Sequence, residues 1–391
     1  MAKNPKKEEN EEHILPLPRA VIEHHSATLA PLLKEWKSSG HVPPVLLFTG
    51  IPGVGKRSLG YYLAQWVFCE RNGFGANTNE DEGPSLFGEP EPAAAPSSGS
   101  SSAFSPEPCG ECAACSRALH GTWVDFTEIL PEADGDSEGR ALKVDQFREL
   151  KRSQGFGAHE GGYRFILIPN ADRMTVQAAN SMLKILEEPP RGWIFFLTAA
   201  DPSLVLPTVL SRCQQHRLRP FDESRIEALV LEAGFTADRA RLAARLAQGS
   251  WGRALALAAK SDDEFHEERG HLVHVLDDPG PSINPLVDWG SSSDAAFDSL
   301  LTQLEALCGD LIRWSVSGAQ AQGYSWQNSD ATRALEAQTR AAVRARGSLE
   351  GARAFWVARS ESLMKARIRS KAPLNRKILL QDILVPWLEI R

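Results

Sequence analysis

The chain has 391 residues, enough for two or three domains, and its apolar and charged fractions of 42% and 24% are typical of globular proteins. The net charge of −7 excludes a protein that binds nucleic acid non-specifically over its whole surface. No apolar run approaches the roughly 20 residues that a membrane helix needs. Residues 1–13 are charged and lack the apolar core of a signal peptide, so the expected location is the cytoplasm.

The first elements in chain order predict a phosphate-binding loop. Apolar residues at helical spacing predict a helix over residues 20–39, and the run Val45–Phe48 predicts a buried strand. This strand leads into GIPGVGKRS, Gly50–Ser58, and a helix over residues 59–68 follows. A strand, a glycine-rich loop of this spacing and a helix are together typical of nucleotide-binding proteins.

The loop has the glycines and the lysine that hold phosphates, but it departs from the pattern at the metal position. Arg57 occupies the place of the hydroxyl residue that binds magnesium, and Ser58 lies about 100° further round a helix. The sequence therefore leaves two interpretations open: bound ATP or ADP without magnesium, or a loop that keeps its shape and holds no nucleotide. The candidate nucleotide-binding residues are Gly50, Gly53, Gly55, Lys56, Arg57 and Ser58.

Four cysteines predict a metal site around a long insertion. Residues 71–108 are rich in Pro, Ser and Gly and poor in aliphatic residues, which predicts disorder. Cys69 precedes this insertion, and the knuckle Cys109-x2-Cys112-x2-Cys115 ends it. Because four thiolates complete a tetrahedral shell, we expect structural zinc within a module over residues 69–115, with an iron–sulfur cluster as the alternative.

Strands and helices alternate over residues 123–200. This alternation predicts a parallel sheet with helices on both faces. The expected strands are Val124–Ile129, Phe165–Ile168 and Trp193–Thr198, and the expected helices are Val144–Ser153 and Thr175–Glu188. The apolar face of the second helix is expected to comprise Val176, Ala179, Met182, Leu183 and Leu186. The later residues predict helices alone.

The strand that ends at Ile168 lacks two acids. In nucleotide-hydrolysing proteins of this build, one acid at this place holds magnesium and the next positions the attacking water. Here the two residues are Pro169 and Asn170, which cannot do either. We therefore expect no ATP hydrolysis and no magnesium site.

Two basic features have competing interpretations. Arg212, in Ser211-Arg212-Cys213, is either a plain surface arginine or one that reaches a phosphate held by a neighbouring subunit. Residues 340–377 carry eleven Lys and Arg against two Glu, which suits DNA phosphates. Solvated helix faces that pack with partners explain this basic run more simply.

The motifs together resemble a known family. The phosphate loop, the four cysteines, RFILIPNADRMTVQAANSMLKILEEPP and FFLTAADPSLVLPTVLSRC follow one another as in the AAA+ clamp-loader family of bacterial DNA polymerase III. Within that family the chain is most similar to the delta-prime subunits, closely over about residues 20–220. The resemblance is weaker beyond, where Gly249–Leu255 is similar to the lid motif and Leu374–Lys377 to the start of the collar helices.

The resemblance implies an organisation and a function. After a disordered tail (1–19) it implies a AAA+ domain (20–219), a helical lid (220–284) and a helical collar (285–391) for oligomerisation. The chain would be a non-hydrolysing, delta-prime-type subunit in a heteropentameric ring with motor (gamma or tau) and delta subunits. The ring loads the sliding clamp onto primed DNA, so clamp and DNA are partners through the complex, and no membrane is involved.

The resemblance also assigns residues. Arg212 would act in trans, as an arginine finger on the ATP of the adjacent subunit. Structural zinc would be bound by Cys69, Cys109, Cys112 and Cys115. Motor subunits carry a nucleotide-sensing arginine where this chain has Gly252, and Arg253 is displaced by one residue, so we do not expect it to sense nucleotide.

Two other functions are weighed against this one. The first is an active, ATP-hydrolysing motor subunit of the gamma or tau type, and the absence of the two acids after Ile168 argues against it. A stand-alone zinc-dependent DNA-binding protein is opposed by the acidity of the chain. We expect neither ATPase nor polymerase activity from this chain, although it would be part of a DNA-directed DNA polymerase holoenzyme.

Overall fold

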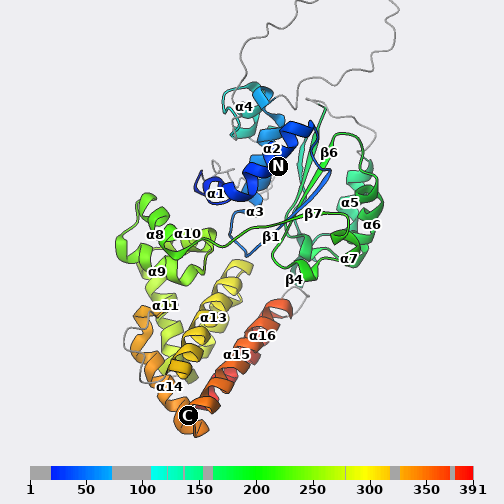
Figure 1. Cartoon of the computed structure of the whole chain (residues 1–391). Helices are drawn as coiled ribbons and strands as arrows, with labels where there is room; N and C mark the ends of the chain where they lie inside the picture. The colour runs from blue at the N-terminus through cyan, green and yellow to red at the C-terminus, as the bar shows by residue number, and fades with distance from the viewer. Residues whose placement is uncertain are drawn as a thin grey trace, which may run out of the picture. The chain divides into compact units, whose positions relative to one another are not determined.

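The computed structural model describes residues 19–72, 107–120, 122–134, 137–152, 162–277, 279–317, 326–369 and 375–390. Nearly all of the predicted tail and of the predicted disordered insertion lie outside these residues. The chain divides into an α/β unit, residues 1–51, 55–131 and 142–219, and a helical unit, residues 52–54, 132–141 and 220–391. Their elements are labelled in Figure 1. In the part of the chain described, no helix is long and apolar enough to span a membrane.

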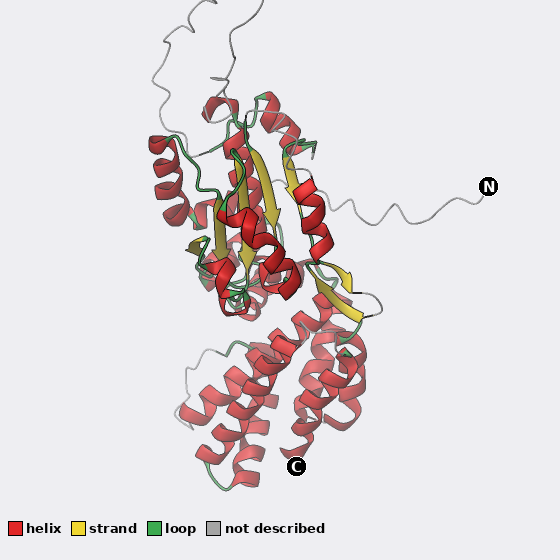
Figure 2. Cartoon of the chain, turned by 90° about the vertical axis from the view of Figure 1, so that its right-hand side faces the viewer, coloured by secondary structure: helices red, strands yellow, loops and turns green. Residues whose placement is uncertain are grey.

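The α/β unit is built on a five-stranded parallel sheet in the order β2-β5-β6-β1-β7 (Figure 2). The strands are β1 (Val45–Thr49), β2 (Phe126–Glu128), β5 (Arg164–Ile168), β6 (Trp193–Ala199) and β7 (Gln214–Arg217). All residues of β1 and β6 are buried, and all of β5 except its first residue. Continuous burial of this kind requires cover on both faces of the sheet.

Helices provide that cover. In Figure 1, α2 and α3 lie on one face of the sheet, and α5 and α6 lie on the other. Leu167 of β5 packs against α3 at Gly60, whereas Ile166 and Ile168 belong to the core cluster shared with α5 and α6. The helices of this unit are α1 (Arg19–His24), α2 (Ser26–Ser39), α3 (Lys56–Phe68), α4 (Ala113–Leu119), α5 (Val144–Arg152), α6 (Val176–Glu187) and α7 (Pro207–Leu210). Short 3-10 turns are η1 (Glu70–Asn72), η3 (Ala171–Arg173) and η4 (Pro202–Leu204).

The structure confirms the predicted parallel sheet flanked by helices and corrects two details. The helix expected over residues 20–39 is two helices, α1 and α2, which are separated at His25. Val176 is 57% exposed, so its place in the predicted apolar face of α6 is wrong, and Ala178 and Ile185 are buried there instead. Val176 is the first residue of α6, where the chain has only begun to enter the core.

The helical unit contains the hairpin β3 (Glu132–Asp134) and β4 (Ser137–Ala141) and then helices alone. Its large core cluster is centred on α13 and α15 and includes Leu304, Leu311, Trp356 and Leu380. The predicted all-helical C-terminal region is therefore confirmed. The helices are α8 (Glu223–Glu232), α9 (Ala237–Ala247), α10 (Trp251–Ala259), α11 (Asp262–Asp277), α12 (Pro279–Gly290), α13 (Asp294–Ser317), α14 (Thr332–Arg346), α15 (Leu349–Arg369) and α16 (Arg376–Leu384), with η6 (Ser329–Ala331) and η7 (Val385–Ile390) as 3-10 turns.

A buried polar network fixes α11 to α13 within this unit. Arg269 is 4% exposed; its guanidinium pairs with Asp330 at 2.7 Å and donates to the Gln303 side chain at 3.2 Å. Asp310 is fully buried and accepts hydrogen bonds from the backbone N–H and the side-chain amide of Asn328, at 2.9 and 2.8 Å. Removing one member would leave a buried charge or polar group without its partner, which is strongly destabilising.

Candidate functional site

The lysine of the phosphate loop is bonded to the loop itself. Lys56 is the first residue of α3 and only 8% exposed. Its ammonium group donates to the backbone carbonyls of Gly50, at 2.6 Å, and of Ile51, at 2.9 Å. The N–H groups of Lys56 that would donate to the terminal phosphates of a nucleotide therefore donate here to carbonyl oxygens of the loop.

The glycines of the loop allow neighbouring segments to lie against it. Gly53 and Gly55 have φ values of +73° and +100°, which favour glycine. A Cβ on Gly55 would lie 2.3 Å from a methyl carbon of Val21 in α1, and one on Gly53 would lie 2.3 Å from the Ser250 hydroxyl. The N–H of Gly252, in the first turn of α10, donates to the Gly53 carbonyl at 2.8 Å. Close packing by the chain itself thus accounts for these glycines.

Arg57, which replaces the metal-binding hydroxyl, is held in an ion pair at the end of β2. Its Nε and Nη2 donate to the two carboxylate oxygens of Glu128, at 2.6 and 2.7 Å. The Tyr61 hydroxyl donates to the same carboxylate at 2.7 Å. Burial, together with this acceptor, raises the pKa of Tyr61 to about 12. Arg57 therefore ties α3 to the sheet, and Ser58 beside it is half-buried.

The end of β5 has the geometry of a turn and no acid. Pro169 is buried, and the exposed Asn170 has a left-handed backbone with φ +56°. The N–H of Asn170 donates to the hydroxyl of Thr198 in β6 at 3.1 Å. The chain then enters the 3-10 turn over Ala171–Arg173. Pro169 and Asn170, which directly follow the strand, offer neither a carboxylate for a metal nor a base for water.

The four predicted cysteines lie together. Cys69 follows α3, and the other three lie before and within α4. All four Sγ atoms lie within 4.8 Å of one another, and those of Cys109 and Cys115 are 3.9 Å apart. Tetrahedral zinc with bonds of about 2.3 Å would separate its sulfur ligands by about 3.8 Å. The cluster could therefore hold a metal ion, and its donor set and spacing fit zinc.

Backbone amides support the sulfur atoms of this cluster. The N–H groups of Cys109, Cys112 and Cys115 donate to Sγ of Cys69, Cys109 and Cys112, at 3.4, 3.3 and 3.5 Å. Burial raises the pKa of the Cys109 thiol, but hydrogen bonds from the N–H groups of Glu111 and Cys112 outweigh it and lower the pKa to about 7. Such donors stabilise thiolates, the form that binds metals.

Arg212 lies just after α7, and its side chain is 29% exposed. One Nη of the guanidinium forms an ion pair with Glu187, the last residue of α6. The other Nη donates to the Thr208 carbonyl at 2.5 Å and to the Ser211 hydroxyl at 3.2 Å. The arginine is thus oriented by its own chain and partly open to solvent.

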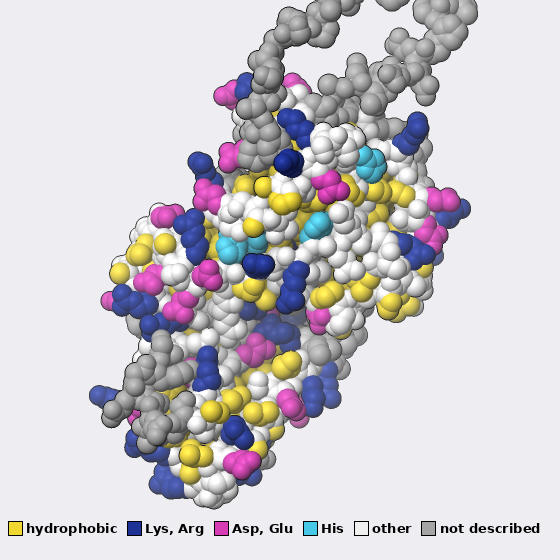
Figure 3. Space-filling model, in the orientation of Figure 1, with side chains coloured by type: hydrophobic (Ala, Val, Ile, Leu, Met, Phe, Trp, Pro, Cys, Tyr) yellow, Lys and Arg dark blue, Asp and Glu magenta, His cyan; other side chains and the backbone are white. Residues whose placement is uncertain are grey.

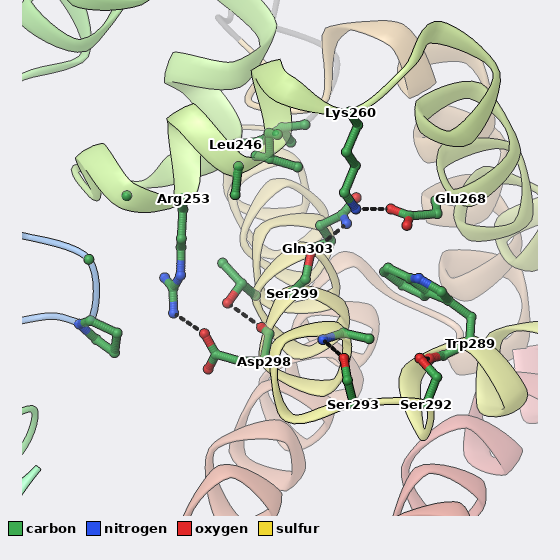
Figure 4. A pocket seen from close by; sticks show the side chains of 17 residues that line it. Leu246, Arg253, Lys260, Glu268, Trp289, Ser292, Ser293, Asp298, Ser299 and Gln303 are labelled. Carbon is green, nitrogen blue, oxygen red and sulfur yellow. Dashed lines mark hydrogen bonds and ion pairs between the residues drawn. The ribbon is translucent and has the colours of Figure 1, made fainter. Parts of the chain in front are cut away.

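Figure 4 shows a pocket in the helical unit, lined mainly by residues of α10 and α13. Its volume is about 500 Å³. Arg253 points to Asp298 there, at 3.0 Å, and Lys260 pairs with Glu268 beside Trp289. The cations of this pocket are therefore balanced by acids.

Asp298 is also paired with Arg367 of α15. Burial raises the pKa of Asp298, and the two arginines outweigh it, so the net pKa lies below its usual range. Asp298 thus links Arg253 of α10 to Arg367 of α15.

The C-terminal basic run is partly internal. Arg376 is 9% exposed, and Arg367 pairs with Glu305 as well as Asp298. On the face seen in Figure 3, Lys and Arg side chains are interspersed with Asp and Glu. That face therefore offers no extended surface of one sign.

Sequence reasoning missed the partners of the functional side chains. Glu128, Glu187 and Asp298 orient Arg57, Arg212 and Arg253, from 71, 25 and 45 residues away along the chain. Such pairs are set by the tertiary fold, and no local spacing rule marks them. Of these three acids, only Glu187 belongs to a motif identified from the sequence, in its segment LEEPP. That motif does not indicate Arg212 as the partner.

Comparison with curated proteins gives matches to DNA polymerase III subunits. The family described as "DNA polymerase III, delta subunit" matches residues 95–222. DNA polymerase III subunit delta' of Escherichia coli is 31% identical over 213 residues, 54% of this chain and 53% of the relative. Subunit delta' of Pseudomonas aeruginosa is 34% identical over 175 residues, 45% of this chain and 42% of the relative. The predicted resemblance to delta-prime subunits is confirmed, and the chain spans about half the length of these relatives.

A tau subunit and a solved structure also match. DNA polymerase III subunit tau of Escherichia coli is 26% identical over 304 residues, 74% of this chain and 38% of the relative. A solved gamma subunit-related protein of Thermotoga maritima covers 92% of this chain and 100% of its own, with 16% identity and a TM-score of 0.40.

Proposed function

Since the chain is a relative of the delta-prime subunits of the bacterial clamp loader, we propose that it is a non-hydrolysing subunit of such a complex. The observation that carries the proposal is the end of β5, where Pro169 and Asn170 replace the two acids of a hydrolysing site. Arg57, engaged with Glu128, supplies no hydroxyl for magnesium. Hydrolysis by this chain would lack both the metal and the base.

The proposed contribution to catalysis is made in trans. Arg212 is oriented at the surface and partly open to solvent, which suits a guanidinium that reaches the phosphates of ATP on an adjacent motor subunit. A guanidinium stabilises the charge that develops on the transferred phosphoryl group. The other residues of the α/β unit provide the rigid sheet that carries Arg212.

The proposed partners are gamma or tau motor subunits and a delta subunit, in a five-membered ring. Through that ring the chain would act on the sliding clamp and on primed DNA in the cytoplasm. The part of the helical unit with the large core around α13 and α15 is the proposed collar that holds the ring together. The lid over residues 220–284 and the collar over 285–391 are proposed as separate functional segments of that unit.

The cysteine cluster is proposed to bind structural zinc. Four thiol ligands leave no open coordination position, so zinc here would tie α4 to the end of α3 and take no part in catalysis. Backbone N–H groups donate to three of the four sulfur atoms and help to hold them in place.

Two ATPase measurements test the proposal. The isolated chain is expected to show no turnover, whereas turnover that Lys56→Ala abolishes would make it a motor subunit. In a loader reconstituted with wild-type motor and delta subunits, Arg212→Ala is expected to lower DNA-stimulated ATP turnover about 10-fold or more. Arg217→Ala, which removes an exposed arginine of β7, is the matched control. Unchanged turnover with Arg212→Ala, at unchanged assembly, would refute the trans role.

A further inference from the structure

The ion pair between Arg212 and Glu187 is too exposed to be explained by stability. The side chains are 29% and 49% exposed. Ion pairs open to solvent change the stability of a protein little, because water and salt screen them. Glu187 also ends α6, where the negative end of the helix dipole disfavours a carboxylate. Glu187 therefore contributes little to stability and lies at the unfavourable end of the helix dipole, so stability does not explain its position.

The contacts of the guanidinium give that explanation. Three oxygens surround Arg212: the Glu187 carboxylate, the Thr208 carbonyl and the Ser211 hydroxyl. Two of them come from the short turn that carries Arg212, and only Glu187 comes from another element. Without Glu187, one Nη would lose its charged acceptor, and the long side chain could leave this orientation through its free rotations.

We propose that Glu187 is the positioning residue of Arg212; this proposal rests on the trans role of Arg212 given above. Glu187 holds the guanidinium in the conformer that is presented to the adjacent subunit. A guanidinium has five N–H donors, so Glu187 keeps its contact while other donors of Arg212 reach the phosphate oxygens of the ATP on the neighbour. Glu187 itself touches neither the nucleotide nor the reacting atoms.

Glu188 provides a matched control in the next position. It is exposed, it carries the same charge, and it forms no ion pair among the residues that the structure describes. The reconstituted loader, with wild-type motor and delta subunits, should be measured with Glu187→Gln, Glu187→Asp, Glu188→Gln and Arg212→Ala. The readouts are kcat and KM for ATP under DNA stimulation, together with assembly of the complex.

We expect Glu187→Gln to lower kcat about threefold to tenfold, because the reacting groups are no longer held in a productive geometry. KM for ATP should stay unchanged, since the nucleotide is bound by the neighbouring subunit. Glu187→Asp should restore part of kcat, and Glu188→Gln should behave as wild type. A merely structural role would instead change assembly and would not separate kcat from KM.

A charge exchange sharpens the test. The double variant Glu187→Arg with Arg212→Glu keeps an ion pair between the two positions but removes the guanidinium from position 212. It should assemble normally and show the low kcat of Arg212→Ala. Recovery of wild-type kcat in this variant would overturn the proposal, because the pair alone would then suffice.

The outcomes separate the two proposals. If Arg212→Ala lowers kcat while Glu187→Gln equals wild type, the positioning role is wrong and the trans role stands. A rise in kcat with Glu187→Gln also overturns positioning, since Glu187 would then compete with the phosphate. If Arg212→Ala has no effect, the proposed function itself fails.

Discussion

The phosphate loop and the cysteine cluster both carry a binding motif, but only the cluster has its ligating atoms arranged around a common centre. In the loop, Lys56 donates to two carbonyls of the loop, and the space beside the glycines is filled by Val21 and Ser250. In the cluster, four sulfur atoms converge within 4.8 Å, and backbone amides only support them from outside. A motif in a sequence therefore shows which atoms are present, and the fold decides whether a ligand can use them.

The largest expected effect concerns the cysteine cluster. Cys112→Ser should lose the bound zinc, and with it on the order of 5 kcal/mol of unfolding free energy, because metal binding contributes directly to folding. Metal analysis and urea unfolding of the purified chain measure both quantities. Cys213→Ser, outside the cluster, should keep one zinc per chain. Wild-type protein that contains no metal and four titratable thiols here would contradict the site.

The next effect concerns the packing of the loop. Gly55→Ala should lower the unfolding free energy by about 2–4 kcal/mol, since the new Cβ meets Val21 and the positive φ is strained. Gly40→Ala is the matched control, with φ +66° and nothing within 4 Å of its Cβ, and it should lose only about 1 kcal/mol. Equal losses in the two variants would mean that Val21 does not press on the loop.

Lys56 tests whether the loop is occupied by its own chain. Lys56→Met should cost about 1–2 kcal/mol of unfolding free energy in the absence of nucleotide, because two hydrogen bonds are lost. Addition of ATP should not raise the melting temperature of either protein. A rise for wild type that Lys56→Met abolishes would show that the loop binds nucleotide after all.

The last effect is a pH dependence beside the loop. The pKa of Tyr61 is raised from 10.0 to about 12, so the native state keeps a proton that the unfolded state loses above pH 10. The stabilisation is complete below pH 10 and is lost as pH rises to about 12. Between these values the unfolding free energy of wild type should fall more steeply than that of Tyr61→Phe. Parallel curves would show that Glu128 and burial do not act on this hydroxyl.

Local sequence patterns predicted the parts of the fold that depend on residues close together in the chain. The alternating strands and helices, and the sulfur ligands at short spacing, follow from neighbouring residues, and the structure agrees with them. The ends of α1 and α2 and the exposure of Val176 were missed, because tertiary packing sets them. The pairs Arg57–Glu128 and Arg212–Glu187 join distant segments, so no periodicity in the sequence could have indicated them.

The contact between Gly252 and Gly53 has an evolutionary consequence. A Cβ on Gly252 would lie 3.1 Å from Cα of Gly53 and 3.3 Å from its carbonyl oxygen. A single mutation that placed an arginine at position 252 would therefore press on the loop backbone before it could serve a nucleotide. Replacement of Gly252 by a larger residue therefore requires a compensating change in the loop backbone first, and that change gains nothing alone. The contact thus makes glycine at position 252 hard to replace by single mutations.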